Sequence, residues 1–246
     1  MIRLLTILSI AFLITDVTAA EPNTLTDAEK TDGWRLLFDG KTTKGWVGIG
    51  KTEFPAKGWT VVDGALHHEK GGGGGDIVTA EHFENLELAW EWKIGPAGNS
   101  GLKYNLVDPN KAVGFEYQMI DDENHPDGVR GGSLHQTAAL YDIIAPSAEG
   151  KTNPAGAGKA NPVGEWNRSR VVLRGNHLEH WINGVKTIEV ELGSEALKAA
   201  IAKSKFKSVP NFGVKTKSPI LLQDHGDEVS VRNIKIRTKR VVIPPP

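Results

Sequence analysis

The chain has 246 residues, of which 39% are hydrophobic and 24% are charged, proportions typical of a folded globular protein rather than a disordered chain. It contains no cysteine, which excludes a disulfide scaffold, a thiolate zinc site, an iron–sulfur cluster and a cysteine nucleophile. The formal net charge of −1 gives no electrostatic basis for nucleic acid or an anionic membrane as the main partner.

The first 20 residues have the pattern of a secretory signal peptide. A positive charge at Arg3 precedes an almost wholly apolar run over residues 4–13, and small residues follow up to Ala20. The apolar run is too short to span the hydrocarbon of a bilayer. We therefore expect a bacterial protein that is secreted or periplasmic and that has no membrane attachment after the signal peptide is cleaved.

The remainder of the chain shows no linker that would divide it. After an N-terminal extension over residues 21–32, we expect one domain over residues 33–240. Two segments rich in glycine and other small residues, 71–75 and 147–162, are flanked by strand patterns on both sides. They are therefore expected to be long loops inside that domain.

Strand patterns follow one another along the chain. Residues 86–94 alternate between apolar and polar side chains with a period of two, as a half-buried strand does. Pairs such as Asp63-Gly64 and Asn183-Gly184 favour the turns that close tight hairpins. The expected strands are residues 59–62, 65–67, 86–94, 171–174, 177–182, 185–190 and 229–237.

Only residues 194–205 have a helical pattern. Ser194 can cap the N-terminus, Glu195 lies in the first turn, and an apolar stripe includes Leu197 and Ile201. Many short strands with turns between them, and a single helix, predict the fold class. We expect an all-β protein, a jelly-roll β-sandwich with one short helix.

Residues 114–125 carry the strongest signal of a functional site. On a strand, Glu116 and Gln118 point to one face, while the apolar side chains between them point to the other. An unpaired carboxylate is costly to bury, so these two side chains suit a wet cleft. Asp121 would lie on the opposite face unless a bulge or the end of the strand turned it into the cleft. The alternative is an edge strand that shows its polar face to solvent.

Two further strands carry polar side chains in the same way. Gln223 and His225 follow an apolar run, and Lys103 and Asn105 share one face of another strand. Together these strands predict one concave polar surface, which His135 could also reach. Such a surface suits a sugar, whose hydroxyl groups need polar partners and whose C–H faces stack on aromatic rings. The candidate aromatic walls are Trp90, Trp92, Trp166, Trp181 and Tyr141, although a core position is favoured for most single tryptophans.

The eight histidines form no metal-binding motif. A divalent cation could be bound by carboxylates such as Asp121 and Asp122, but nothing in their spacing requires one. The glycine run at 71–75 is not followed by Lys-Ser or Lys-Thr, so phosphate binding is not expected either. We therefore expect no cofactor.

Several short motifs occur along the chain in an order that is more specific than any one of them. They are Gly33-Trp34, Phe38-Asp39-Gly40, Gly45-Trp46, Asn99-Ser100-Gly101, residues 114–121, Gly164-Glu165-Trp166-Asn167, Trp181-Ile182-Asn183-Gly184, Ser204-Lys205-Phe206, residues 222–226 and Arg232-Asn233-Ile234. In these motifs the chain resembles the 3-keto-disaccharide hydrolase family, also described as 3-keto-glucoside lyases and 3-keto-2-hydroxy-glucal hydratases. The resemblance covers residues 33–238 and implies a concanavalin-A-like jelly roll with a small sugar as ligand on its concave sheet.

The resemblance also implies a reaction. A ketone at C3 of a sugar acidifies the proton at C2, and removal of that proton lets the C1 substituent leave, after which water can add. Glu116 is the expected base, Lys103 or Gln223 would stabilise the enolate, and His225 or Asp121 would protonate the leaving group. The expected catalytic residues are therefore Glu116, Asp121 and His225, and the expected substrate-binding residues are Lys103, Asn105, Gln118, His135, Tyr141, Gln223 and Trp92.

Two other hypotheses stay open. Glu116, Gln118 and Asp121 have the spacing of the Glu-x-Asp-x-x-Glu signature of laminarinase-type glucanases, retaining enzymes whose two carboxyl groups lie about 5–5.5 Å apart. Gln in place of the middle Asp, and Asp in place of the last Glu, weaken that interpretation. The other hypothesis is a lectin-like carbohydrate-binding module, which needs aromatic and amide side chains but no base.

Overall fold

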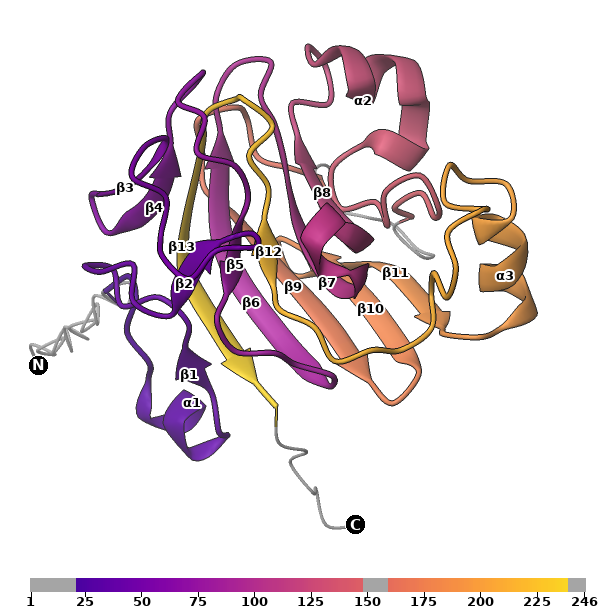
Figure 1. The fold of residues 1–246 in the computed structure, drawn as a ribbon, viewed down its shortest axis with the longest axis horizontal. Helices are drawn as coiled ribbons and strands as arrows, with labels where there is room; N and C mark the ends of the chain where they lie inside the picture. The colour runs from indigo at the N-terminus through magenta and orange to yellow at the C-terminus, as the bar shows by residue number, and fades with distance from the viewer. Residues whose placement is uncertain (1–20, 148–158, 239–246) are drawn as a thin grey trace, which may run out of the picture.

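The computed structural model describes residues 21–147 and 159–238, which form two antiparallel β-sheets packed face to face (Figure 1). The strand order is β11-β10-β9-β6-β13-β4-β3 in the larger sheet, where β1 also pairs with β13, and β2-β5-β12-β7-β8 in the smaller sheet. The predicted signal peptide lies outside the described residues. Among those that are described, no helix is long and apolar enough to cross a membrane.

The strands confirm the prediction of an all-β jelly-roll sandwich. Each expected strand overlaps an observed one. The turns expected at Asp63-Gly64 and Asn183-Gly184 also join paired strands. The larger sheet contains β1 (Arg35–Leu36), β3 (Trp59–Val62), β4 (Ala65–His68), β6 (Leu86–Ile94), β9 (Asn167–Arg174), β10 (His177–Ile182), β11 (Val185–Glu191) and β13 (Val229–Arg237). The smaller sheet contains β2 (Trp46–Gly48), β5 (Ile77–Thr79), β7 (Asn99–Asp108), β8 (Val113–Ile120) and β12 (Leu221–Leu222).

The core lies between the two sheets and is rich in aromatic side chains. Trp90 of β6 and Tyr117 of β8 are buried and meet edge to face, with ring centroids 4.9 Å apart. The alternation of β8 directs Phe115, Tyr117 and Met119 into this core. It therefore leaves Glu116 and Gln118 on the outer face of the smaller sheet.

A chain of hydrogen bonds crosses the core and joins the sheets. The indole N–H of Trp92 donates to Ser169 Oγ at 2.8 Å, the Ser169 hydroxyl donates to Tyr117 Oη at 2.7 Å, and the phenol donates to the carbonyl oxygen of Trp181 at 3.1 Å. Each hydroxyl in the chain accepts one hydrogen bond and donates one. The polar tips of two large buried side chains are thereby satisfied.

The prediction of a single helix is wrong. The expected helix forms as α3 (Glu195–Ile201), and the side chain of Ser194 accepts a hydrogen bond from the N–H of Leu197, but the helix ends at Ile201 rather than at residue 205. The structure also contains α1 (Asp27–Thr31), α2 (Pro126–Gly131) and the 3-10 helices η1 (Pro109–Lys111) and η2 (Gly132–His135). These helices were missed because they are too short to display an apolar stripe: α1 buries no residue, and α2 buries only Gly128.

Replacement of Ser169 by alanine tests the hydrogen-bonded chain across the core. The change leaves the buried N–H of Trp92 without an acceptor, so we expect the free energy of unfolding to fall by about 1–3 kcal/mol. Urea denaturation measures it, with the exposed Ser208→Ala as control. A loss for Ser169→Ala no larger than that of the control would show that the chain contributes nothing to stability.

Candidate functional site

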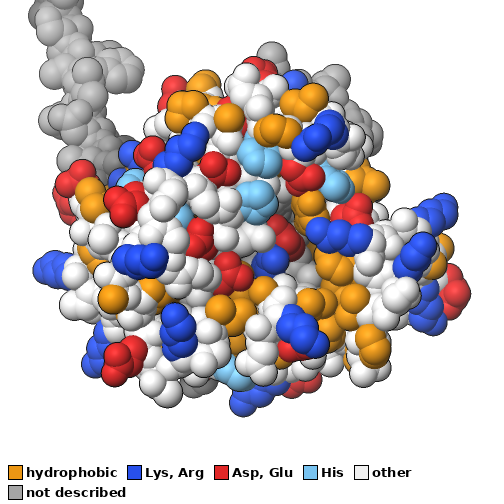
Figure 2. Space-filling view, turned by 45° about the horizontal axis from the view of Figure 1, so that its top comes forward, with side chains coloured by type: hydrophobic (Ala, Val, Ile, Leu, Met, Phe, Trp, Pro, Cys, Tyr) orange, Lys and Arg blue, Asp and Glu red, His pale blue; other side chains and the backbone are white. Residues whose placement is uncertain are grey.

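The outer face of the smaller sheet brings together polar side chains from three strands. β7 and β8 pair so that Lys103 lies opposite Glu116, and Gly101 lies opposite Gln118. On the other side of β7, the backbone N–H of Gln223 donates to the carbonyl oxygen of Gly101 at 3.0 Å. Four expected site residues therefore share one face. Figure 2 shows a hollow in the molecular surface around which acidic, basic and histidine side chains gather.

Glu116 and Lys103 form an ion pair on this face. Lys103 Nζ lies 3.3 Å from Glu116 Oε2, and the two side chains are only 12% and 8% exposed. Nζ also donates to the carbonyl oxygen of Ala112 at 3.4 Å. The carboxylate lies over Gly101. A Cβ built on that glycine would be only 2.4 Å from Oε1 of Glu116. The position of the carboxylate thus depends on a residue that has no side chain.

Three amide oxygens around Gly101 have no hydrogen-bond partner in the described part of the chain. They are Oδ1 of Asn99, Oε1 of Gln118 and Oε1 of Gln223, and all are buried. Asn99 precedes Gly101 by two residues on β7 and so lies on the same face. A buried acceptor without a donor costs free energy. The face therefore suits a ligand that is rich in hydroxyl or amino groups.

The segment after β8 forms a wall beside this face. The backbone N–H of Tyr141 donates to the carbonyl oxygen of Glu116 at 3.0 Å, and its phenol donates to Asp127 Oδ2 at 2.8 Å. Burial raises the pKa of Tyr141, and the hydrogen bond to Asp127 acts in the same direction, so the phenol stays protonated. Lys205 Nζ lies 4.1 Å from the centre of the Tyr141 ring. Burial lowers the pKa of Lys205, although the nearby Glu116 opposes this shift.

His135 links two carboxylates of this wall, those of Asp127 and Asp142. Its two ring nitrogens lie 2.9 Å from Asp127 Oδ1 and 3.1 Å from Asp142 Oδ1. Asp142 Oδ2 in turn accepts the backbone N–H of Lys205 at 2.6 Å. Both nitrogens of His135 are therefore engaged by carboxylates, and the side chain supports the wall. His135 and Tyr141 were both expected to bind substrate, and Tyr141 is the one of the two that contacts Glu116.

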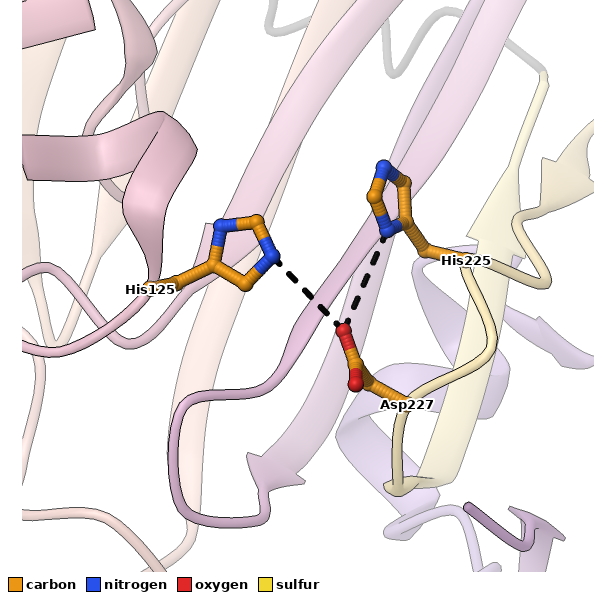
Figure 3. Close-up of side chains that lie close together, drawn as sticks. All are labelled: His125, His225 and Asp227. Atoms are coloured by element: carbon orange, nitrogen blue, oxygen red, sulfur yellow. Dashed lines mark ion pairs between the residues drawn. The ribbon is translucent and has the colours of Figure 1, made fainter. Parts of the chain in front are cut away.

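Two histidines flank a carboxylate at one end of the face (Figure 3). His125 Nε2 and His225 Nδ1 each lie 3.8 Å from Oδ2 of Asp227. The same Oδ2 accepts the backbone N–H of Asn99 at 3.1 Å, so this cluster adjoins the first residue of β7. The side chain of His225 is 43% exposed, whereas those of His125 and Asp227 are 13% and 17% exposed.

The ligand atoms of these three side chains lie within 4.8 Å of one another, which is close enough to surround a cation. A metal-binding imidazole uses the lone pair of one nitrogen and donates the N–H of the other. In His125, however, Nδ1 accepts the backbone N–H of Asp127 at 3.1 Å. The proton of the neutral ring must then lie on Nε2, the nitrogen that faces the cluster. His125 therefore does not fit the role of a metal ligand and presents an N–H group instead.

Asp121 has a structural role in the loop after β8. Its carboxylate accepts backbone N–H groups from Ala97 at 2.8 Å and from Asn124 at 3.1 Å. Burial by itself would raise the pKa of Asp121, but the hydrogen bonds from Asn124 and Ala97 outweigh burial and lower it. A carboxyl group that is held ionised by backbone donors is poorly suited to protonate a leaving group. The expectation that Asp121 is an acid in the cleft is not supported.

Asn105 and Trp92 also lie outside the site. Asn105 has φ +51°, and the pairing of β7 with β8 shifts after Tyr104, so Asn105 does not continue the face of Lys103. Its amide instead accepts the N–H of Thr216 at 2.8 Å and donates to the carbonyl oxygen of Val214 at 3.0 Å. Trp92 is fully buried. It borders a different cavity, of about 910 Å³, whose lining includes Asp121 but neither Glu116 nor Lys103.

Several residues near the site were missed from the sequence. Asn99 could have been found, because it has the same two-residue spacing from Gly101 as Lys103 does. Asp76 precedes β5 and accepts the backbone N–H of Asp224 at 2.8 Å, and burial raises its pKa. Neither Asp76 nor Lys205 lies in a strand, so no periodicity marks them. His125 could not be found from a strand pattern either, because it caps α2.

The change Gly101→Ala tests whether the glycine makes room for Glu116. The backbone of Gly101 is not in the left-handed region, so alanine adds no backbone strain, but its Cβ would collide with Oε1 of Glu116. We expect a crystal structure of the variant to show the Lys103–Glu116 pair separated beyond 4 Å, roughly the limit for an ion pair. The matched control is Gly128→Ala, whose Cβ would have its nearest contact at 3.4 Å. An unmoved Glu116 in the variant would contradict this role for Gly101.

Comparison with known proteins identifies the family of this chain. Residues 33–237 match the model of the 3-keto-alpha-glucoside-1,2-lyase-like domain. A 3-keto-disaccharide hydrolase of Bacteroides thetaiotaomicron is 33% identical over an aligned region that covers 89% of this chain and 83% of that protein. Two crystal structures from Parabacteroides distasonis, both provisionally described as glycosyl hydrolases, are also similar. One has 35% identity and a TM-score of 0.76 over 89% of this chain and 100% of that one. The other has 25% identity and a TM-score of 0.62 over 84% and 99%.

The family match spans both sheets and every side chain described above on the outer face of the smaller sheet. The chain belongs to the family of 3-keto-alpha-glucoside-1,2-lyase-like domains.

Proposed function

We propose that this protein cleaves 3-keto-glycosides by removing the proton at C2 of the keto-sugar, releasing the C1 substituent and adding water, so that the net result is hydrolysis. One observation carries the proposal: the carboxylate of Glu116, paired with Lys103, adjoins a group of unpartnered amide oxygens. Similarity to a 3-keto-disaccharide hydrolase supports the same substrate class. The hydroxyl groups of a sugar would supply the donors that these oxygens lack.

The reaction needs a base at C2, a donor for the ketone oxygen as it becomes negative, and an acid for the leaving oxygen. First the C2–H bond breaks, its electron pair forms the double bond of the enolate, and the proton passes to Glu116. Then the C1–O bond breaks, a C1–C2 double bond forms, the ketone is restored, and the leaving oxygen takes up a proton. Addition of water across the new double bond returns a proton to C2 and restores Glu116 as a carboxylate.

The other groups have separate tasks in this scheme. Lys103 is engaged by Glu116 and by the carbonyl oxygen of Ala112, so it positions the base. Of the two acids expected from the sequence, His225 fits better, because it is exposed at the end of the face whereas Asp121 is held ionised. His225 would protonate the leaving oxygen and recover its proton from the added water.

A retaining glycosidase mechanism has less support. It requires a second carboxyl group about 5–5.5 Å from the first, free to act as acid and base. Asp121, the candidate from the sequence, is occupied by backbone N–H groups of Ala97, Glu123 and Asn124. The strand pairing and the ion pair instead place Lys103 and Gln118 around Glu116, and neither is an acid.

Incubation with a 3-keto-disaccharide and with its unoxidised parent tests the proposal. We expect the keto-sugar alone to be cleaved, because only the ketone makes the C2 proton acidic. Glu116→Gln should abolish turnover and leave substrate affinity within about tenfold, or 1.4 kcal/mol, because it removes the base and keeps the shape of the side chain.

The exposed Glu84→Gln serves as control and should retain wild-type turnover. Cleavage of the parent sugar alone would contradict the proposal and favour a glycosidase. Tight binding of either sugar without cleavage would favour a lectin-like module.

Gln118→Leu and Gln223→Leu test the unpartnered oxygens. Each change removes one acceptor for a sugar hydroxyl, so we expect KM to rise about 2- to 10-fold, or about 0.5–1.5 kcal/mol, while kcat changes little. The free protein should be as stable as the wild type or more stable, because each variant also removes a buried acceptor that had no partner. Steady-state kinetics and urea denaturation measure the two effects. Unchanged KM in both variants would remove these oxygens from the binding site.

A further inference from the structure

His125 occupies an unusual position, at the N-cap of α2. The next residue, Pro126, has no N–H, so the first free backbone donor of the helix belongs to Asp127. That N–H donates to Nδ1 of His125 at 3.1 Å. A ring nitrogen that accepts a hydrogen bond carries no proton, so the neutral imidazole must carry its proton on Nε2. The backbone of α2 therefore fixes the tautomer of this side chain.

The N–H at Nε2 is left open. Its nearest carboxylate oxygen, Oδ2 of Asp227, lies 3.8 Å away, beyond hydrogen-bond distance. Within the described part of the chain, Nε2 has no hydrogen-bond partner. Asp227 is itself bound to the backbone of Asn99, whose unpartnered Oδ1 lies on the same face of β7 as Gly101. The unused N–H of His125 therefore lies at the end of the polar face on which Glu116 also lies.

The environment keeps this imidazole neutral. Burial lowers the pKa of His125, and the neighbouring His225 acts in the same direction, while Asp227, Asp127 and Asp121 oppose the shift. A second proton would have to enter at Nδ1, where it would meet the N–H of Asp127. The hydrogen bond from α2 therefore resists protonation as well as tautomer exchange.

The proposed reaction needs a donor of this kind. Negative charge develops on the ketone oxygen when the C2 proton leaves, and a positioned N–H stabilises it without giving up its proton. Lys103 is already engaged by Glu116 and Ala112. The unpartnered atoms of Asn99, Gln118 and Gln223 are amide oxygens, which would repel an enolate oxygen.

We infer that His125 is a further catalytic residue, a neutral imidazole whose Nε2–H donates to the ketone oxygen of the substrate. This inference rests on the proposed function. As the C2–H electron pair moves into the enolate, the carbonyl electrons move onto the oxygen that His125 holds, and they return when the C1–O bond breaks. No proton is exchanged with His125 in either step.

The ring of His225, the proposed acid, lies 5.6 Å from that of His125 between centroids. The ketone oxygen and the leaving oxygen sit on C3 and C1, with C2 between them. Two donors side by side at one end of the face therefore match the two oxygens on either side of the carbon that loses its proton.

Kinetics of three variants on a 3-keto-disaccharide test the role. His125→Ala should lower kcat about 100- to 1,000-fold, the usual loss for one donor to a developing oxyanion, with KM changed by less than about threefold. His125→Gln keeps a neutral N–H donor and should recover part of that loss. The control His177→Gln, which removes an imidazole paired with Glu179 and Glu191 on the larger sheet, should behave like the wild type.

Nitrogen-15 NMR of the ring tests the tautomer without turnover. The His125 signals, assigned by their absence in His125→Gln, should show Nε2 protonated and Nδ1 unprotonated at neutral pH. A proton on Nδ1, a doubly protonated ring at neutral pH, or a wild-type kcat in His125→Ala would each overturn the inference. So would binding of Mn²⁺ that broadens the signals of His125 and His225 and that turnover requires, because the cluster would then be a cation site.

The same experiments separate the two proposals. If the wild type cleaves the keto-sugar and His125→Ala does so equally well, only the role of His125 fails. If the wild type neither cleaves the keto-sugar nor exchanges its C2 hydrogen in deuterium oxide, the proposed function fails, and the inference that rests on it fails too.

Discussion

The carboxylate of Glu116 can lie on the outer face of the smaller sheet in its observed position only because Gly101, its diagonal neighbour on β7, has no side chain. A sheet face normally fills with side chains from every strand, about 5 Å apart. One glycine in β7 leaves a gap, and the carboxylate leans into it. The ion pair with Lys103, the neighbouring amide oxygens and the proposed chemistry all follow from that gap.

Polar groups around the gap are held by hydrogen bonds within the protein. Tyr141 is hydrogen-bonded to the backbone of Glu116, and Asp127 and Asp142 clamp His135 behind it. Such a network keeps side chains in place before a ligand arrives, which is how donors and acceptors become effective in a partly dry site. Three amide oxygens have no partner among residues 21–147 and 159–238, and they are the part of the network that a ligand would complete.

Asp127 connects the wall to the end of the face. Its carboxylate holds Tyr141 and His135, and its backbone N–H caps the ring of His125. One residue of a six-residue helix thus orients an aromatic side chain and determines the tautomer of an imidazole. This dual role explains how so short a helix can matter to a site built mainly on strands.

The site was predictable where it follows strand periodicity and not elsewhere. Glu116, Gln118 and Lys103 share a face because side chains alternate along β7 and β8. The same rule failed for Asn105, because the pairing shifts after Tyr104 and the residue adopts a positive φ. It could not identify Asp121 as a loop-holding carboxylate, nor find His125 and Lys205, because loops and short helices have no period.

The order of strands and turns, the sandwich class and the outward direction of Glu116 were therefore decided by the sequence alone, since they depend on local alternation and on turn-forming pairs. Which distant side chains meet was decided only by the tertiary structure. The ion pair of Glu116 with Lys103, the clamp on His135 and the cap on His125 depend on register and loop paths, which are set by packing across the whole molecule.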